Sequence, residues 1–294
     1  MSDIHPIVAV TGSSGSDASV VTTAFQHMLR REGAKLAVVD GNGFHRYDRA
    51  EFRDAVRREA EKGRGISHFG PEANLFDRLD ALLRTYAASG GGEHRRYVHC
   101  ADEAERLEQT PGTFTAWDPV PEDTDLLCYE GLHGCHQDDD VDIAQYMDLK
   151  IGMVPVINLE WMRKIDRDTG ERGYTSDAVA KTILRRMQDY VRYIVPQFSR
   201  TDINFQPVPT VDSSDPFAEQ EPVTLEQCVI VVRFRNPIDF GVDFTSLLSR
   251  IRGSFMSRRN TIVLPGSELV FAMELILQPR VHQLLELSQR ARAA

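Results

Sequence analysis

The sequence contains few cysteines, no excess of positive charge and no long apolar run. Its four cysteines, Cys100, Cys128, Cys135 and Cys228, match no metal-site spacing and are too few for a disulfide-based fold in 294 residues. The formal net charge of −10 argues against non-specific nucleic-acid binding. No apolar run approaches the roughly 20 residues that span a bilayer, and no signal peptide precedes the first strand-like segment. We therefore expect reduced thiols, no nucleic-acid or membrane partner, and a cytoplasmic protein.

What is present is an alternation of strand-like and helix-like segments. Strands are predicted at 6–11, 35–40, 126–129, 150–157, 229–234 and 261–264. Helices are predicted at 20–31, 49–62, 74–88 and 176–194, with Ser176 and Asp177 suited to the start of the last one. This alternation indicates an α/β fold with a mostly parallel sheet covered by helices on both faces. We expect antiparallel edges near 207–211 and 90–99, and one domain over residues 1–294.

A cluster of charge lies at residues 164–175, KIDRDTGERGYT, at the end of an apparent helix. Arginine presents a planar fork of donors that binds phosphate, lysine adds a mobile charge, and aspartate can position a hydroxyl or a metal ion. The segment therefore suits a phosphorylated substrate. A solvated helix end with internal salt bridges fits the same pattern equally well.

A Gly and Ser turn follows the first predicted strand. In a P-loop, backbone N–H groups cradle phosphates, a lysine bridges them and a Ser or Thr hydroxyl binds Mg²⁺. Here Ala18 replaces the lysine, and Asp17 replaces a glycine, which adds strain and negative charge where a triphosphate would lie. A plain turn before a helix is the alternative. The positions that match the phosphate contacts are Gly12, Ser13, Ser14, Gly15 and Ser16, and Ser19 matches the Mg²⁺ hydroxyl.

These segments resemble the phosphoribulokinase family, and most closely its shorter bacterial class. The resemblance runs along nearly the whole chain, through 5–6, 11–15, 44–46, 129–134, 155–158, 164–177, 202–205 and 233–237, with Asp177 where the family signature has Glu. It implies a P-loop kinase that uses ATP and Mg²⁺ to phosphorylate D-ribulose 5-phosphate to ribulose 1,5-bisphosphate in the Calvin cycle. It also implies a homo-oligomer, commonly an octamer, with NADH as an allosteric activator and AMP as an inhibitor. Because no GxGxxG fingerprint is present, NADH would bind outside any Rossmann site.

The resemblance also implies roles for individual residues, each of which alone would more often be a surface charge. Glu130 matches the acid that organises Mg²⁺, Asp168 a carboxylate near metal or substrate, and Arg167 an arginine near the transferred phosphoryl group. The metal contacts implied are Ser19, Glu130 and Asp168. The sugar-phosphate contacts implied are His45, Arg49, Lys164 and Arg172. The basic residues that match the effector region are His99, Arg186, Arg233 and Arg258.

Position 42 departs from the family pattern. The family's proton-accepting aspartate matches Asn42, whose amide cannot take a proton at neutral pH, and loss of a general base costs about 10²–10⁴-fold in rate. Asp40, on the same face of the strand, is a poorly placed substitute, and Gly43 favours deamidation of Asn42 to a carboxylate. Two functions therefore remain open: an active phosphoribulokinase, and a catalytically silent relative that binds a sugar phosphate or acts as a regulatory subunit.

Overall fold

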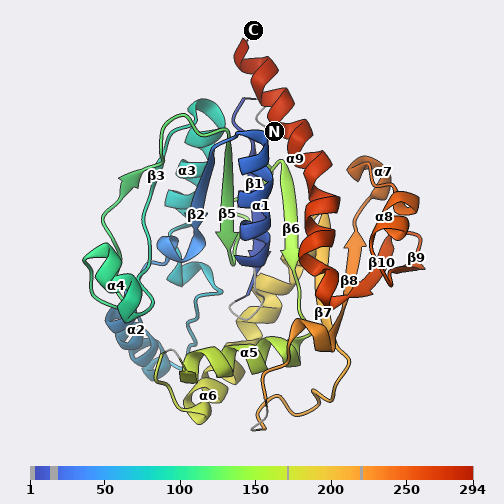
Figure 1. Ribbon diagram of the computed structural model, residues 1–294. Coiled ribbons are helices and arrows are strands. Elements are labelled where there is room, and N and C mark those ends of the chain that lie inside the picture. The colour runs from blue at the N-terminus through green and yellow to red at the C-terminus, as the bar shows by residue number, and fades with distance from the viewer. Residues whose placement is uncertain (1–3, 14–18, 171, 219–220, 294) are drawn as a thin grey trace.

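The computed structural model describes residues 4–13, 19–170, 172–218 and 221–293. Within these residues a central sheet has the strand order β2-β5-β1-β6-β7-β8-β10-β9 (Figure 1). Its parallel part consists of β2 (Leu36–Asp40), β5 (Leu126–Gly131), β1 (Ile7–Gly12), β6 (Leu149–Met153) and β7 (Ile203–Pro209). Its antiparallel part consists of β8 (Cys228–Phe234), β10 (Thr261–Pro265) and β9 (Phe255–Arg258). The expected α/β fold, mostly parallel with antiparallel edge strands, is confirmed.

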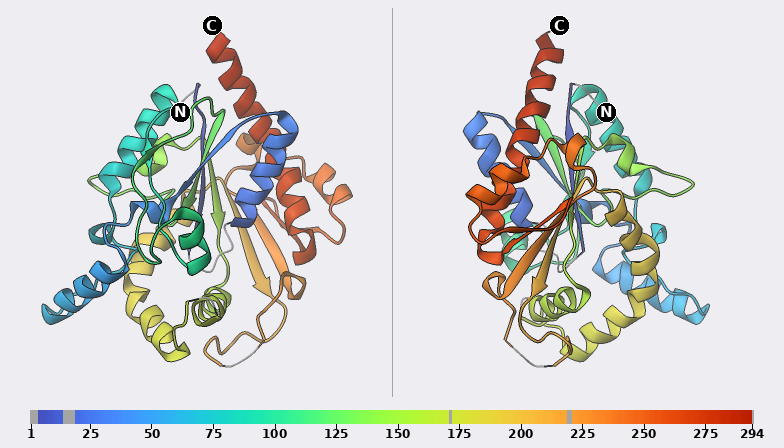
Figure 2. Two further views of the ribbon diagram at one scale, coloured as in Figure 1. Left: turned by 60° about the vertical axis from the view of Figure 1, so that its left-hand side comes forward. Right: turned by 90° about the vertical axis from the view of Figure 1, so that its right-hand side faces the viewer.

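Both faces of the sheet are covered by helices, which explains why β1 is apolar throughout. Ile7 and Ala9 belong to the core beneath α3 (Phe76–Ser89). Val8 and Val10, which alternate with them, belong to the larger core beneath α1 (Ser19–Glu32) and α9 (Leu269–Ala293). Successive side chains of a strand point to opposite faces, so a central strand needs apolar residues at every position. Figure 2 shows the helices on either side of the sheet.

The carboxyl ends of the parallel strands form the edge at which the functional site is expected. The connection that leaves β1 leads to β2 on one side of the sheet, whereas the connection that leaves its neighbour β6 leads to β7 on the other side, so the two diverge between β1 and β6. Ligands of open α/β sheets bind in the crevice at such a switch point. The helices that lie around this edge are α2 (Arg49–Glu61), α5 (Ile157–Gly170) and α6 (Ser176–Asp189) (Figure 1).

The remaining elements are short and peripheral. A 3₁₀ turn, Gly41–Phe44, follows β2, and a π-helical turn, Tyr190–Ile194, follows α6. The other helices are α4 (Ala101–Leu107), α7 (Pro237–Phe240) and α8 (Phe244–Arg250). A separate two-stranded sheet joins β3 (Glu93–His94) to β4 (Asp118–Pro119). None of the helices in the described part of the chain combines the length and apolar character needed to cross a membrane.

Several predicted boundaries are wrong. Segment 207–211 does pair in antiparallel fashion, through residues 207–209 with β8, but these residues belong to β7, which also pairs with β6, so they do not form an edge strand. Segment 90–99 contributes to the small sheet instead of the main one. The strand predicted at 150–157 ends at Met153, and Ile157 begins α5. The helix predicted at 176–194 leaves α geometry after Asp189, and its N-cap is Thr175, whose hydroxyl accepts the Ala178 N–H.

The long helix α9 was absent from the predicted elements. It contains Pro279, which removes a backbone hydrogen bond and is normally read as the end of a helix. Apolar contacts hold α9 in place on both sides of this proline: Met273 and Leu277 precede it, Val281 and Leu285 follow it, and all four belong to the larger core. Tertiary packing here overrides the local preference.

Candidate active site

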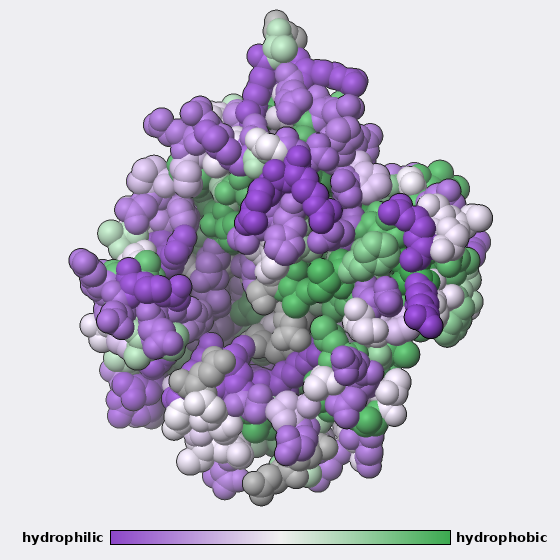
Figure 3. Space-filling model, viewed as in Figure 1, coloured by the Kyte–Doolittle hydropathy of each residue, from purple (hydrophilic) through white to green (hydrophobic). Residues whose placement is uncertain are grey.

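A pocket of about 1180 Å³ opens at the carboxyl edge of the parallel strands. It is lined by the ends of β1, β2 and β5 and by α2, α5 and α6. Figure 3 shows it as a hollow in the face of the molecule, with hydrophilic residues around much of its rim. Most sites for a single small molecule enclose roughly 300–1000 Å³. The pocket is therefore large enough for two substrates side by side.

The charged cluster of residues 164–172 lies in this pocket, at the end of α5. Asp168 is only 5 % exposed and its carboxylate accepts hydrogen bonds from Lys164 Nζ, from Arg167 Nη2 at 2.9 Å and from Arg172 Nη1 at 3.0 Å. Burial opposes ionisation of Asp168, but Lys164 and Arg167 hold the pKa of its carboxyl group below the usual value. Burial in turn lowers the pKa of Lys164 to about 8. The internal salt bridges that one alternative predicted are present, but the cluster lies in the pocket and not on a solvated helix end.

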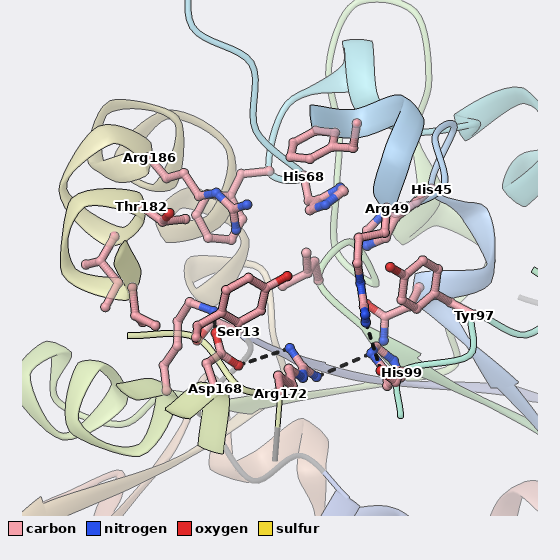
Figure 4. Close-up of a pocket in the computed structure, with 18 of the residues that line it drawn as sticks. Ser13, His45, Arg49, His68, Tyr97, His99, Asp168, Arg172, Thr182 and Arg186 are labelled. Carbon is pink, nitrogen blue, oxygen red and sulfur yellow. Dashed lines mark hydrogen bonds and ion pairs between the residues drawn. The ribbon is translucent and has the colours of Figure 1, made fainter. Parts of the chain in front are cut away.

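A second polar group joins α2 to this cluster. Arg172 Nη2 lies 3.3 Å from His99 Nδ1, and Arg49 Nη2 donates to the His99 carbonyl at 2.8 Å (Figure 4). Burial, followed by the charge of Arg172, lowers the pKa of His99 to about 4. Tyr97 lines the pocket beside them. The structure thus brings together Arg49, Lys164 and Arg172, three of the four residues expected to contact the sugar phosphate.

The fourth, His45, lies in a stack of rings on the same side of the pocket. Its Nδ1 is 2.9 Å from Asn74 Oδ1, and its ring stacks on His68 with centroids 4.2 Å apart. His68 stacks in turn on Phe52, 3.9 Å away. Burial lowers the pKa of His45 to about 4 and the pKa of His68 well below its usual value, so both rings are neutral. Sequence analysis missed His68, which belongs to no motif and meets His45 only through the fold.

The four residues expected in an effector region are not brought together. Arg186, on α6, and His99 both line the pocket that contains Lys164. Arg233 and Arg258 lie on β8 and β9, exposed, with Thr261 of β10 between them as the register partner of each. The pattern in the sequence thus combined residues from two separate places in the fold.

At the end of β2, Asn42 is bound to a carboxylate. Both its backbone N–H and its side-chain Nδ2 donate to Asp40 Oδ1, each at 2.9 Å. Asp40 is the register partner of Glu130 on β5, and both line the pocket. Burial is the largest influence on the pKa of Asp40 and raises it, the two bonds from Asn42 lower it, and the charge of Glu130 raises it. The resulting pKa is about 7. Asp40 is therefore in direct contact with Asn42, the residue that departs from the family pattern. Its position on the strand alone did not indicate this contact.

Arg95 holds the turn that carries Asn42. Its Nε donates to the Gly43 carbonyl and its Nη2 to the His45 carbonyl, both at 2.7 Å. Its guanidinium lies 3.7 Å from the Phe114 ring centroid, a cation–π contact. The approach is close enough that a Cβ added at Gly43 would lie 1.9 Å from the Arg95 carbonyl oxygen. Glycine is therefore required at this position.

Part of the predicted phosphate loop lies outside the described residues, namely Ser14, Gly15, Ser16, Asp17 and Ala18. Gly12 ends β1, Ser13 lines the pocket and Ser19 begins α1. Glu130 accepts the Thr22 hydroxyl at 2.5 Å, and burial raises its pKa. Within the described ranges, no group of three or more His, Cys, Asp or Glu side chains could hold a metal ion. Mg²⁺ commonly needs only one or two carboxylates beside substrate phosphates, and Glu130 offers an oxygen ligand of the right kind.

Comparisons with known proteins agree with this geometry. The sequence pattern of the "Phosphoribulokinase / Uridine kinase family" matches residues 7–214. The chain is 53% identical over 292 residues to "Phosphoribulokinase, plasmid" of Cupriavidus necator, covering 99% of each chain. It is 52% identical to "Phosphoribulokinase" of Nitrobacter vulgaris, covering 98% of this chain and 99% of the relative. The solved structure of phosphoribulokinase from Rhodobacter spheroides has a TM-score of 0.89 and 47% identity, covering 98% of this chain and all of that one.

Proposed function

The chain belongs to the phosphoribulokinase and uridine kinase family, and from that membership we propose that it transfers the γ-phosphoryl group of ATP to D-ribulose 5-phosphate. The observation that carries the proposal is the cluster of Lys164, Arg167 and Arg172 around Asp168 inside the pocket. The product is ribulose 1,5-bisphosphate, and the enzyme acts as a single cytoplasmic domain. Phosphoryl transfer needs mainly positioning and charge stabilisation, which such a cluster supplies.

The proposed nucleotide side of the pocket is the end of β1 with the segment that follows it. We propose that Gly12, which ends β1, and Ser13, which lines the pocket, contact the phosphates, as residues of a phosphate loop do. We propose Ser19 and Glu130 as the protein contacts of Mg²⁺, which when bound would neutralise phosphate charge. Asp168 is a poorer metal ligand, because its two oxygens already accept hydrogen bonds from three cations.

The proposed acceptor side holds the sugar phosphate near Arg49, Arg172 and His45. Lys164, whose pKa is about 8 because burial opposes its charge, can stabilise negative charge on the transferred group together with Arg167. Asp168 is the residue that keeps these cations in place. Each interaction is already formed in the protein, so little reorganisation is needed when charge develops.

We assign the proton-accepting role to Asp40. Asn42 Nδ2 donates to Asp40, which leaves the amide oxygen of Asn42 to orient the attacking hydroxyl while the carboxylate of Asp40 takes the proton. A general base works best when its pKa lies near the working pH, and the pKa of Asp40, raised by burial to about 7, meets that condition. The competing function, a silent sugar-phosphate-binding or regulatory subunit, is favoured by Asn42 itself, which stands where the family has a carboxylate.

Regulation and assembly are proposed from family membership alone. We propose a homo-oligomer of the octameric class, with NADH as an activator that acts through Arg233 and Arg258, which flank Thr261 on neighbouring strands. Light scattering after size exclusion measures the oligomeric state. Activation by NADH in the Arg233→Gln and Arg258→Gln variants tests the effector contacts, and an unchanged response in both would remove them.

The first experiment measures ribulose 5-phosphate-dependent ATP consumption by freshly purified protein, beside Asn42→Asp and the double variant Asn42→Asp with Asp17→Gly. Turnover by the unmodified chain supports the active kinase. Silence of the unmodified chain with turnover by a repaired variant identifies a silent relative. Peptide mass spectrometry must show Asn42 intact in the active preparation, because deamidation before Gly43 would supply a carboxylate at position 42.

A further inference from the structure

The proposed mechanism leaves two side chains of the pocket unused, and each has one buried nitrogen without a hydrogen-bond partner in the described part of the chain. Arg186 projects from α6, and its buried Nε has no hydrogen-bond partner among the described residues. His68 lies opposite (Figure 4), and its buried Nδ1 is likewise unpaired in the described part of the chain. Buried polar groups nearly always have partners, and one left unpaired costs about 1–3 kcal/mol. Two such groups at one pocket therefore point to a ligand.

Arg186 differs from Arg167 and Arg172 in that no salt bridge joins it to an acid within the described residues. Arg167 and Arg172 each form an ion pair with Asp168. Asp168 and Asp189 affect Arg186 only at longer range, and in the described ranges no acid forms a salt bridge with it. Its guanidinium lies 5.8 Å from the centroid of the Phe52 ring. Burial of a charge without a counter-ion is costly, and burial accordingly lowers the pKa of Arg186 to about 10.

The charge of Arg186 acts on the whole acceptor side. After burial, it is among the causes that lower the pKa values of His45 and His68. It also opposes the charge of Lys164, whose pKa burial has already lowered. The pocket thus contains positive potential that the protein does not compensate on this wall. An anion bound between Arg186 and His68 would relieve all of these interactions.

We propose that Arg186 and His68 join Arg49, Arg172 and His45, the contacts proposed above, in binding the phosphate monoester that the acceptor substrate already carries. The guanidinium can donate two parallel hydrogen bonds to phosphate oxygens, and the neutral His68 ring can donate a third from Nδ1. The proposal rests on the proposed sugar-phosphate kinase function. It makes Arg186 a specificity residue, since an unphosphorylated sugar would leave the buried cation unpaired. Lys164 and Arg167, which pair with Asp168, are then free to act on the transferred phosphoryl group.

Stability measurements separate this role from a structural one. Arg186→Met keeps the length of the side chain and removes a buried, unpaired charge, so the melting temperature of the ligand-free protein should stay the same or rise. The increase in melting temperature that ribulose 5-phosphate gives the unmodified protein should be lost. Arg192→Met is the matched control, because Arg192 is exposed and does not line the pocket. It should keep the full increase.

Kinetics give a second readout. In Arg186→Met the KM for ribulose 5-phosphate should rise roughly 10- to 100-fold, the effect of losing a charge-assisted hydrogen bond. The KM for ATP should not change. His68→Phe, which keeps the ring stack but removes the donor, should raise the same KM by a smaller factor. Arg192→Met should change neither constant.

Three outcomes would overturn the subsite. The first is a strong fall in the melting temperature of ligand-free Arg186→Met. The second is an increase in the melting temperature of Arg186→Met with ribulose 5-phosphate that equals the increase in the unmodified protein. The third is an equal effect of Arg186→Met on the KM values for ATP and ribulose 5-phosphate. The proposed function fails in a different way. If inorganic phosphate stabilises the protein through Arg186 while ribulose 5-phosphate gives neither stabilisation nor turnover, the anion subsite stands and the substrate assignment falls.

Discussion

Asp40 and Asp168 line the same pocket, yet their surroundings shift the pKa values of their carboxyl groups in opposite directions. Asp168, at the end of α5, accepts hydrogen bonds from three cations, which hold its pKa below the usual value although burial opposes ionisation. Asp40, at the end of β2, is bound by two amide N–H groups of Asn42 and faces Glu130, and burial raises its pKa to about 7. One carboxylate is thus fixed in its charged form, and the other can change its protonation near neutral pH.

The difference assigns the two residues to different tasks. A carboxylate surrounded by cations is a poor proton acceptor, because its pKa is low and its oxygens are already engaged. A carboxyl group with a pKa near the working pH exchanges protons readily. The α5 end of the pocket is therefore suited to hold charge in place, and the β2 end to accept a proton. In the proposed mechanism, this division would allow the chain to act without a carboxylate at position 42.

The largest expected effect tests the β2 end. Asp40→Asn removes the proposed proton acceptor and should lower kcat by about 10²–10⁴-fold. Asn42→Ala, which removes only the orienting amide, should cost less. The pH dependence of kcat/KM distinguishes a chemical role from a structural one: the unmodified enzyme should lose activity as pH falls below about 7, and Asp40→Asn should lack that dependence. A kcat for Asp40→Asn close to the unmodified value would remove Asp40 from the mechanism.

The second prediction tests the α5 end. Asp168→Asn leaves Lys164, Arg167 and Arg172 close together without their shared acid. Removal of one partner of a buried ion pair costs about 3–5 kcal/mol, so the free energy of unfolding from urea titration should fall by about that amount. Asp166→Asn is the matched control, since Asp166 is exposed on the same helix, and it should be neutral. Equal stability of the two variants would show that solvent compensates the cations around Asp168.

The sequence predicted those features of the β2 and α5 ends of the pocket that depend on neighbouring residues in the chain. It did not predict those that depend on residues distant in sequence. The strand that became β5 and the helix end that carries Lys164 were predictable, because apolar runs and charge spacing are local properties. The pKa of Asp40 was not, since it depends first on burial and also on Glu130, a partner set by the register of two strands distant in sequence. His68 was missed for the same reason: its partners are the rings of His45 and Phe52, which only the fold brings to it.

The residues predicted for the effector region lie in two places within one chain, for a related reason. Resemblance marked Arg186 and Arg233 alike, as basic residues at matching positions. In the structure Arg186 is in the pocket wall and Arg233 is exposed on β8. A sequence pattern shows that a residue is basic. It does not show whether that residue is buried or which residues it contacts, because these depend on the packing of the fold.

A smaller effect is expected from Arg95, which positions the β2 end without lining the pocket. Arg95→Lys keeps the charge but cannot donate to the Gly43 and His45 carbonyls in a fixed fork or stack flat on Phe114. We expect kcat to fall by roughly 10-fold, which corresponds to the loss of about 1.4 kcal/mol of transition-state stabilisation. Arg96→Lys, an exposed neighbour, should leave kcat unchanged. Equal rates for the two variants would mean that the turn keeps its shape without Arg95.

The smallest effect concerns stability against pH at Asp40. Burial raises the pKa of its carboxyl group in the folded protein to about 7, above the ordinary value of about 3.9. The folded state therefore binds more protons than the unfolded state between these values, and stability falls as pH rises from about 4 to about 7. Asp40→Asn, which is neutral at every pH, should be more stable than the unmodified protein at pH 8, where the folded unmodified protein has to ionise the buried carboxyl group. At pH 4 that advantage should vanish. Urea titrations at pH 4 and pH 8 measure the difference in the free energy of unfolding between the variant and the unmodified protein. A difference of equal size at both pH values would show that Asp40 is not protonated in the folded protein at low pH, contrary to the contrast with Asp168.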